Sequence, residues 1–183
     1  MGAHKITDIA QELPVGQTMM HEHYDAFVLD NDIALLKLET QATLGAGVGR
    51  VCVPPDDGLS LDNITCYITG WGTTTEGESQ PSTYLQEASV PTITNEQCQS
   101  LYDENGITVN ITSSMLCAGQ VGVGGVDACL LDGGGPLVCE FNGKWYLEGA
   151  ASWGVGCGRP NFPGVYTRVR FHQDWIHDTM SSN

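Results

Sequence analysis

The stretch Asp127-Ala128-Cys129-Leu130-Leu131-Asp132-Gly133-Gly134-Gly135-Pro136 holds two aspartates, a cysteine and three consecutive glycines. It leads directly into two apolar segments, 137–141 and 144–147, which flank Asn142-Gly143. Asn-Gly between apolar runs is the strongest short hairpin signal, because both residues tolerate the positive φ angles of a type I′ turn. The sequence therefore predicts a β-hairpin immediately after the glycine run.

The rest of the chain carries further short apolar runs separated by turn-forming residues. The run 32–38 is nearly continuous in apolar residues, which predicts a strand buried against a core. Strands are also predicted at 66–72, 85–90 and 164–169, whereas residues 1–31 give only weak strand signals. With 23 glycines and no alternation of strands and helices, the chain is predicted to be all-β, a sandwich or a barrel.

Two helices are predicted beside these strands. Thr94, with Gln97 three residues later, is typical of a capped helix N-terminus, so a short helix is expected there. Near the C-terminus, apolar residues at helical spacing predict a helix over 171–180 that docks on the β core. These residues are Phe171, Trp175, Ile176 and Met180.

Composition limits the classes of partner. The 183 residues suit one domain or two small ones, and 41% hydrophobic content is enough for a core. The formal net charge is −15 with only seven Lys and Arg, which argues against nucleic acid or an anionic membrane as a partner. Basic peptides or proteins remain possible partners, and the alternative is an acidic surface that only resists association.

Seven cysteines, none in a Cys-x-x-Cys pair, predict a disulfide framework formed in an oxidising compartment, with one thiol left over. Two glycosylation sequons begin at Asn63 and Asn110 and fit a secreted protein. The first six residues lack the apolar segment of a signal peptide, and no later run is long enough to span a membrane. Cysteine usage and the N-terminal residues thus point in different directions.

Six motifs follow one another along nearly the whole chain. They lie at 31–38, 68–72, 115–119, 127–136, 152–154 and 163–169. In this order the chain resembles the trypsin- and chymotrypsin-like serine proteases. The resemblance implies two six-stranded antiparallel barrels with the active site in the cleft between them, an extracellular location and no cofactor.

Compared with that family, the chain resembles a protein truncated at its N-terminus, because the first strands and the Ala-Ala-His-Cys segment of the catalytic base are not found in it. We expect a remnant of the first barrel at 1–50, a linker at 51–65, and the second barrel with a C-terminal helix at 66–183. An incomplete barrel is expected to expose strand edges and apolar surface. This predicts poor solubility or a partner that completes the barrel.

The resemblance also implies three disulfides, which join Cys66 to Cys139, Cys98 to Cys117 and Cys129 to Cys157. The short Cys98–Cys117 loop is expected to contribute about 3 kcal/mol to stability. Cys52 is left over, since in many relatives the matching cysteine tethers a segment from the far N-terminus. A partner linked through Cys52 is therefore an expectation.

The family's acyl transfer needs a hydroxyl, a histidine, an aspartate and two oxyanion-binding N–H groups. Asp32 matches the triad acid, but Gly133 stands at the nucleophile position, where the hydroxyl is lost. The oxyanion positions are Leu131 and Gly133, and Leu131 replaces a glycine whose backbone conformation disfavours a β-carbon. Asp132 matches an aspartate that pairs with an amine freed by activation. Without that amine we expect an unpaired carboxylate and a loosely ordered loop.

None of the five histidines occurs in a context like that of the family's catalytic base. They are His4, His21, His23, His172 and His177. The His21-Glu22-His23 triplet lacks the i, i+4 pair of zinc hydrolases, so surface imidazoles are expected there rather than a metal site.

The substrate pocket of the family is better preserved than its catalytic groups. Asp127 matches the pocket-floor residue that selects Lys and Arg, and Gly154 and Gly164 match residues that keep the pocket open. Ser152 and Trp153 match the strand that pairs with a bound peptide. Three functions stay open: an inactive homologue that binds basic side chains, an active endopeptidase cleaving after Arg or Lys, and a fragment of an incomplete gene product with no function.

Overall fold

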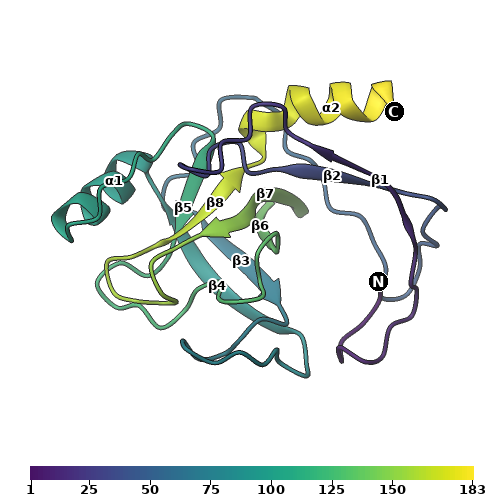
Figure 1. Cartoon of the computed structure of the whole chain (residues 1–183), viewed down its shortest axis with the longest axis horizontal. Helices are drawn as coiled ribbons and strands as arrows, with labels where there is room; N and C mark the ends of the chain where they lie inside the picture. Colours follow the sequence, from purple (N-terminus) through teal and green to yellow (C-terminus); the bar gives the residue numbers. More distant parts are fainter.

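The computed structural model describes all 183 residues, and its strands and helices follow one another as shown in Figure 1. In chain order they are β1 (Val15–Met20), β2 (Ala34–Leu38), β3 (Thr65–Gly70), β4 (Gln86–Ile93), α1 (Asn95–Glu104), β5 (Met115–Ala118), β6 (Pro136–Phe141), β7 (Lys144–Trp153), β8 (Gly164–Arg168), a 3-10 turn (Arg170–His172) and α2 (Gln173–Ser182). No helix is both long enough and apolar enough to cross a membrane.

Six strands close into one antiparallel barrel in the order β3-β4-β5-β8-β7-β6. Its interior is a single cluster of buried side chains from these strands and the segment before β3. The members are Leu61, Cys66, Ile68, Val90, Leu116, Ala118, Leu137, Cys139 and Tyr166. Closure leaves no unpaired edge in this half of the molecule. The predicted all-β fold with a barrel and a C-terminal helix is confirmed.

The local signals in this half form the expected elements. Asn142 and Gly143 have φ angles of 52° and 75° and connect β6 to β7. Thr94 caps α1 by accepting a hydrogen bond of 3.0 Å from the N–H of Gln97. The structure also contains the disulfides Cys66–Cys139, Cys98–Cys117 and Cys129–Cys157.

Strands β1 and β2 form a separate two-stranded sheet. The prediction that 32–38 is a buried strand is wrong, because β2 begins at Ala34 and Leu36 is 60% exposed. On the partner strand, which the sequence signalled only weakly, Met20 is 70% exposed. An isolated pair of strands has no third strand and no opposing sheet to cover its apolar side chains.

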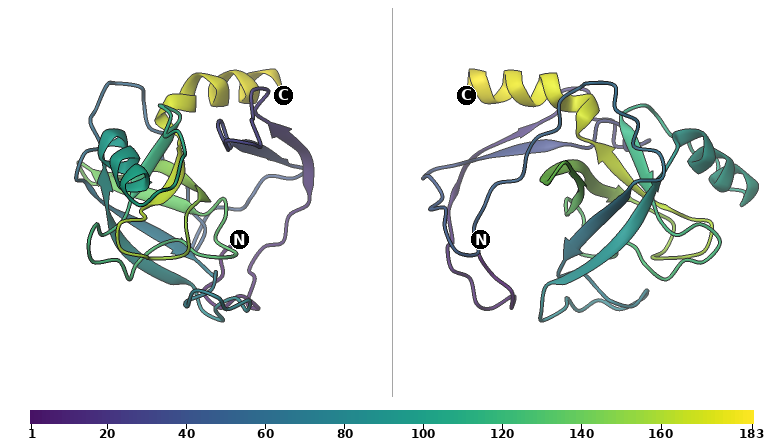
Figure 2. Two further views of the ribbon diagram at one scale, coloured as in Figure 1. Left: turned by 60° about the vertical axis from the view of Figure 1, so that its left-hand side comes forward. Right: turned by 180° about the vertical axis from the view of Figure 1, so that it is seen from behind.

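Helix α2 lies alongside the β1–β2 sheet, as the views in Figures 1 and 2 show. The indole N–H of Trp175 donates to Glu22 at 2.8 Å, and Gln17 on β1 bonds Asn183 at 3.1 Å. The predicted apolar face of this helix is only partly correct. Ile176 is buried, whereas Phe171, in the preceding 3-10 turn, and Met180 are 52% and 67% exposed. The helix therefore bridges the small sheet and the barrel.

A buried ion pair lies at the base of this helix. Arg170 donates to both carboxylate oxygens of Glu148 on β7, at 3.0 and 2.7 Å, and the Glu148 side chain is fully buried. The same guanidinium donates to the carbonyl of Pro55 at 2.6 Å and pairs with Asp57 at 2.5 Å. These bonds hold the segment before β3 against the barrel.

Candidate functional site

A pocket of about 280 Å³ opens between the loop after β5 and the end of β7. All of the predicted pocket and oxyanion residues line it. They are Asp127, Leu131, Gly133, Ser152, Trp153, Gly154 and Gly164. Both Cys129 and Cys157 line the pocket, and their disulfide joins two segments that are distant in the sequence.

Asp127 is the one carboxylate that lines this pocket. Its Oδ2 accepts a hydrogen bond of 3.0 Å from the N–H of Gly158, but its buried Oδ1 has no partner. Burial raises the pKa of the Asp127 carboxyl to about 6, although the bond from Gly158 lowers it. A β-carbon at Gly164 would overlap Oδ1, so the buried oxygen can hold this position only with glycine at 164.

Three buried side-chain atoms in the structure lack a hydrogen-bond partner, and all belong to residues of this pocket. They are Asp127 Oδ1, Trp153 Nε1 and the Tyr166 hydroxyl. Burial also raises the pKa of the Tyr166 phenol above its usual value, so the phenol stays neutral beside the carboxylate. Buried polar atoms without partners are rare in folded proteins and mark sites that a ligand can satisfy.

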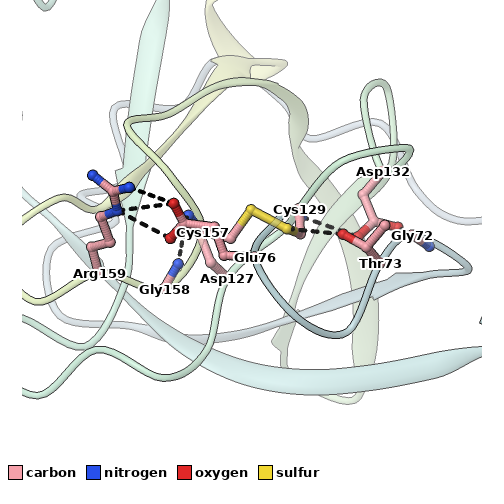
Figure 3. The surroundings of a disulfide bond; sticks show 9 residues. All are labelled: Gly72, Thr73, Glu76, Asp127, Cys129, Asp132, Cys157, Gly158 and Arg159. Atoms are coloured by element: carbon pink, nitrogen blue, oxygen red, sulfur yellow. Dashed lines mark hydrogen bonds and ion pairs between the residues drawn. A yellow bond between two sulfur atoms is a disulfide. The ribbon is translucent and has the colours of Figure 1, made fainter. Parts of the chain in front are cut away.

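A second cavity of about 300 Å³ shares Asp127 and the disulfide with the first. Asp132 lies in it, and its carboxylate accepts hydrogen bonds from the N–H groups of Gly72 at 2.8 Å and Cys129 at 3.1 Å (Figure 3). The expectation of an unpaired Asp132 is therefore wrong. Two backbone amides pair with this carboxylate, and a β-carbon at Gly72 would overlap it.

Asp32 is held against the barrel from two sides. Its carboxylate accepts a hydrogen bond of 2.6 Å from the Ser152 hydroxyl, and its backbone carbonyl accepts one of 2.6 Å from Thr167. Two residues earlier, Asp30 accepts from Thr112 at 2.7 Å. Asp32 therefore has a fixed position beside the pocket residue Ser152, with no imidazole among its hydrogen-bond partners.

At Gly133, the expected nucleophile position, there is space for a side chain. A β-carbon built on Gly133 meets no atom within 4 Å. None of the five histidines lines either of the two cavities that Gly133 borders. The N–H groups of Leu131 and Gly133 donate no hydrogen bond within the protein and are free to bind a ligand oxygen.

Leu131 has a φ of 75°, which is the left-handed region that favours glycine. Its side chain is 64% exposed and so gains little from packing. A leucine in this conformation costs about 1–2 kcal/mol. Leu131 thus adopts a conformation that favours glycine despite its β-carbon.

We expect the Leu131→Gly variant to be more stable by about 0.5–1 kcal/mol, because relief of the strained φ exceeds the entropy that glycine adds to the unfolded chain. Urea unfolding under oxidising conditions measures this. The matched control is Leu130→Gly, since Leu130 is also exposed, at 57%, but has no positive φ. The control is expected to lose stability. Equal losses in both variants would contradict the strain at Leu131.

The remaining predicted residues lie away from the pocket. Asn63, Asn110 and the free Cys52 are exposed. His21 and His23 are near α2, where the His21 ring lies 4.9 Å from the Trp175 ring. Glycosylation and a partner at Cys52 stay untested predictions.

Sequence reasoning missed two features of the site's surroundings. His172 is almost fully buried, with Nδ1 2.9 Å from the Arg168 carbonyl and Nε2 3.1 Å from Asn31 Oδ1; burial lowers its pKa. Glu76 bonds Arg159, which lies 83 residues later, and the Cys157 N–H. No local sequence signal indicates either contact.

Comparisons with known proteins agree with this arrangement. A family model described as Trypsin matches residues 1–176. Trypsin-1 of Astacus astacus is 42% identical over 166 residues, which cover 91% of this chain and 67% of that protein. Transmembrane protease serine 7 of Mus musculus is 46% identical over 173 residues, 92% of this chain and 20% of that protein. Testisin of Homo sapiens is 42% identical over 153 residues, 83% of this chain and 48% of that protein. The chain thus spans between one fifth and two thirds of these relatives.

Proposed function

We propose, because this chain belongs to the trypsin family of serine proteases, that it is a homologue without hydrolytic activity whose Asp127 pocket binds the side chain of arginine or lysine. Its partner would be a basic peptide or protein. Extracellular location is part of the proposal, supported by three disulfides and by relatives whose names describe a transmembrane protease.

The observation that carries the proposal is the partnerless Oδ1 of Asp127 in an open pocket. A buried carboxylate with one unsatisfied oxygen is costly, and a guanidinium or amidinium group satisfies it with charge-assisted hydrogen bonds. The absence of a β-carbon at Gly164 leaves room beside Oδ1. A cationic side chain of the ligand is therefore the chemical match for this pocket.

Two further features support a basic partner. The net charge of −15 favours the approach of a cationic protein and disfavours acidic ones. Strand β7 ends at Trp153, and the next residue, Gly154, lines the pocket. An extended peptide that places its basic side chain in the pocket would thus run beside this segment.

Hydrolysis is not part of the proposal because the chain lacks a hydroxyl at Gly133. Acyl transfer in this family begins with attack by that hydroxyl and transfer of its proton to an imidazole. No histidine of this chain borders the pocket. The free N–H groups of Leu131 and Gly133 would support binding of a ligand oxygen without a covalent step.

The proposal predicts saturable, pH-dependent binding of benzamidine, a small amidinium cation. Because the pKa of Asp127 is raised to about 6, the carboxylate is present above that pH and is lost as the pH falls through it. We expect affinity to be constant near pH 8 and to fall about tenfold per pH unit below 6. Isothermal titration calorimetry between pH 4.5 and 8.5 measures this.

Two variants of equal charge change serve as controls for this titration. Asp127→Asn is expected to bind weakly and without the pH dependence, whereas Asp178→Asn changes an exposed aspartate that has no side-chain partner. The latter should bind as the unchanged protein does. Absence of saturable binding at millimolar benzamidine and pH 8 would refute the pocket function.

A further inference from the structure

The carboxylate of Glu76 bonds the segment 157–159, which forms part of one wall of the pocket. Both oxygens of Glu76 accept from Nε of Arg159, at 3.1 and 3.0 Å, and Oε1 also accepts from its Nη2. Glu76 Oε2 accepts in addition from the N–H of Cys157 at 3.3 Å. Figure 3 shows this carboxylate bridging Arg159 and the disulfide.

The same segment, 157–159, is also hydrogen-bonded to Asp127. The N–H of Gly158, one residue after Cys157, donates to Asp127 Oδ2 at 3.0 Å, and the Gly158 carbonyl accepts from Gly125 at 2.7 Å. Consecutive amides, those of Cys157 and Gly158, thus bond two different carboxylates. Their positions are coupled because a single α-carbon, that of Cys157, separates the two peptide units.

This wall has little stiffness of its own. Gly156 and Gly158 flank Cys157 with φ angles of 74° and 61°, and glycine has more backbone freedom than any other residue. The Cys129–Cys157 disulfide fixes the segment at one point only. Besides the backbone bond between Gly125 and Gly158, the bonds from Glu76 attach the segment at a further point, at Arg159.

We propose that Glu76 is a positioning residue for the Asp127 pocket: by holding Cys157 and Arg159 it keeps the Gly158 N–H in place on Asp127, and so sets the affinity of the pocket for cations. The proposal rests on the proposed function for its ligand. Glu76 does not line the pocket of about 280 Å³ in which we place the ligand; it borders the second cavity, which shares Asp127 with that pocket.

The bonds from Glu76 to Arg159 and Cys157 are called the clamp from here on. Its ion pair is exposed, so salt can weaken it. The side chains of Arg159 and Glu76 are 50% and 38% exposed, so mobile ions screen their attraction. Raising the ionic strength is expected to weaken the clamp and the affinity of the pocket together. Salt also screens the attraction between the cationic ligand and Asp127. The salt dependence of the affinity must therefore be compared with that of a variant without the clamp.

The test compares Glu76→Gln with Glu78→Gln. Both variants remove one negative charge from the same exposed loop, but the Glu78 side chain has no hydrogen-bond or ionic partner. We expect Glu76→Gln to weaken benzamidine binding about two- to fivefold at pH 8 and low salt, the range of a well-formed exposed ion pair. The difference between the two variants should disappear at high salt.

A pH profile separates positioning from a general loss of stability. Loosening the Gly158 N–H removes the bond that stabilises ionised Asp127, so the midpoint of benzamidine binding should move to higher pH in Glu76→Gln. The ionisable groups beside Asp127 are the phenols of Tyr102 and Tyr166, whose raised pKa values keep them neutral over this range. Glu78→Gln is expected to keep the original midpoint.

Amide hydrogen exchange of the ligand-free protein tests the clamp without any ligand. The N–H groups of Cys157 and Gly158 are expected to exchange about two- to fivefold faster in Glu76→Gln than in Glu78→Gln. If the unchanged protein binds no benzamidine, the proposed function fails, and exchange still decides whether the clamp exists. Unchanged exchange, affinity and pH midpoint in Glu76→Gln would overturn the positioning role.

Discussion

Replacing Gly133 with serine is expected to leave amide hydrolysis undetectable, about a millionfold below an enzyme with a complete triad. The variant regains the hydroxyl at the nucleophile position, but a hydroxyl at its ordinary pKa is a weak nucleophile without a base. In a triad the parts act as a unit, so restoring one of them recovers almost nothing. The unchanged chain, which lacks the hydroxyl as well, is expected to give the same result.

The structure indicates that the Gly133→Ser substitution does not disturb its surroundings. A β-carbon at Gly133 meets no atom within 4 Å, so the serine side chain fits without displacing the loop. The carboxylate of Asp32 is bonded to Ser152 at 2.6 Å and has no imidazole to orient. Neither cavity beside Gly133 is lined by a histidine. Failure of the variant would therefore reflect the lack of an imidazole beside position 133 rather than a damaged site.

Release of p-nitroaniline from an arginine anilide measures the outcome, together with covalent labelling by an arginine-directed phosphonate. Retained benzamidine binding shows that the variant is folded and that its pocket is intact. Labelling of Gly133→Ser, or turnover by the unchanged chain, would contradict the proposed inactivity and would favour the endopeptidase that family membership alone suggests.

Features encoded by neighbouring residues could be predicted from the sequence. The hairpin at Asn142-Gly143 and the cap at Thr94 depend on a few adjacent residues, and both form as expected. Short strands separated by turns predicted a sandwich or a barrel, and the resemblance to the family selected the barrel that the structure has. The prediction that β2 is buried was wrong. An apolar run indicates a strand, but it does not say which neighbours cover that strand. Leu36 is exposed since only β1 pairs with its strand.

The candidate site shows the same division. The motif around Asp127 and Gly133 located the pocket residues, and the structure brings them together in one cavity. The partners of their carboxylates could not be foreseen, because hydrogen bonds between distant segments leave no periodic signal. Asp132 accepts from Gly72, which is 60 residues away, and Glu76 pairs with Arg159 across 83 residues.

The second large effect is expected at the buried ion pair of Arg170 and Glu148. The Arg170→Met variant should lose about 3–5 kcal/mol of unfolding free energy, because it leaves a fully buried carboxylate without a counter-charge. It also removes the donors to Pro55 and Asp57, which hold the segment before β3. Urea unfolding of the oxidised protein measures the loss.

A double variant distinguishes loss of the charge partner from loss of packing. Arg170→Met with Glu148→Leu removes both charges and is expected to recover most of the stability, since an apolar pair of similar volume is often as stable as a buried ion pair. Arg159→Met, which breaks an exposed pair, should cost far less stability. If Arg170→Met cost as little as Arg159→Met, Glu148 would have to be stabilised by something other than Arg170. If the double variant were no more stable than Arg170→Met, packing of the arginine stem rather than the uncompensated charge would account for the loss.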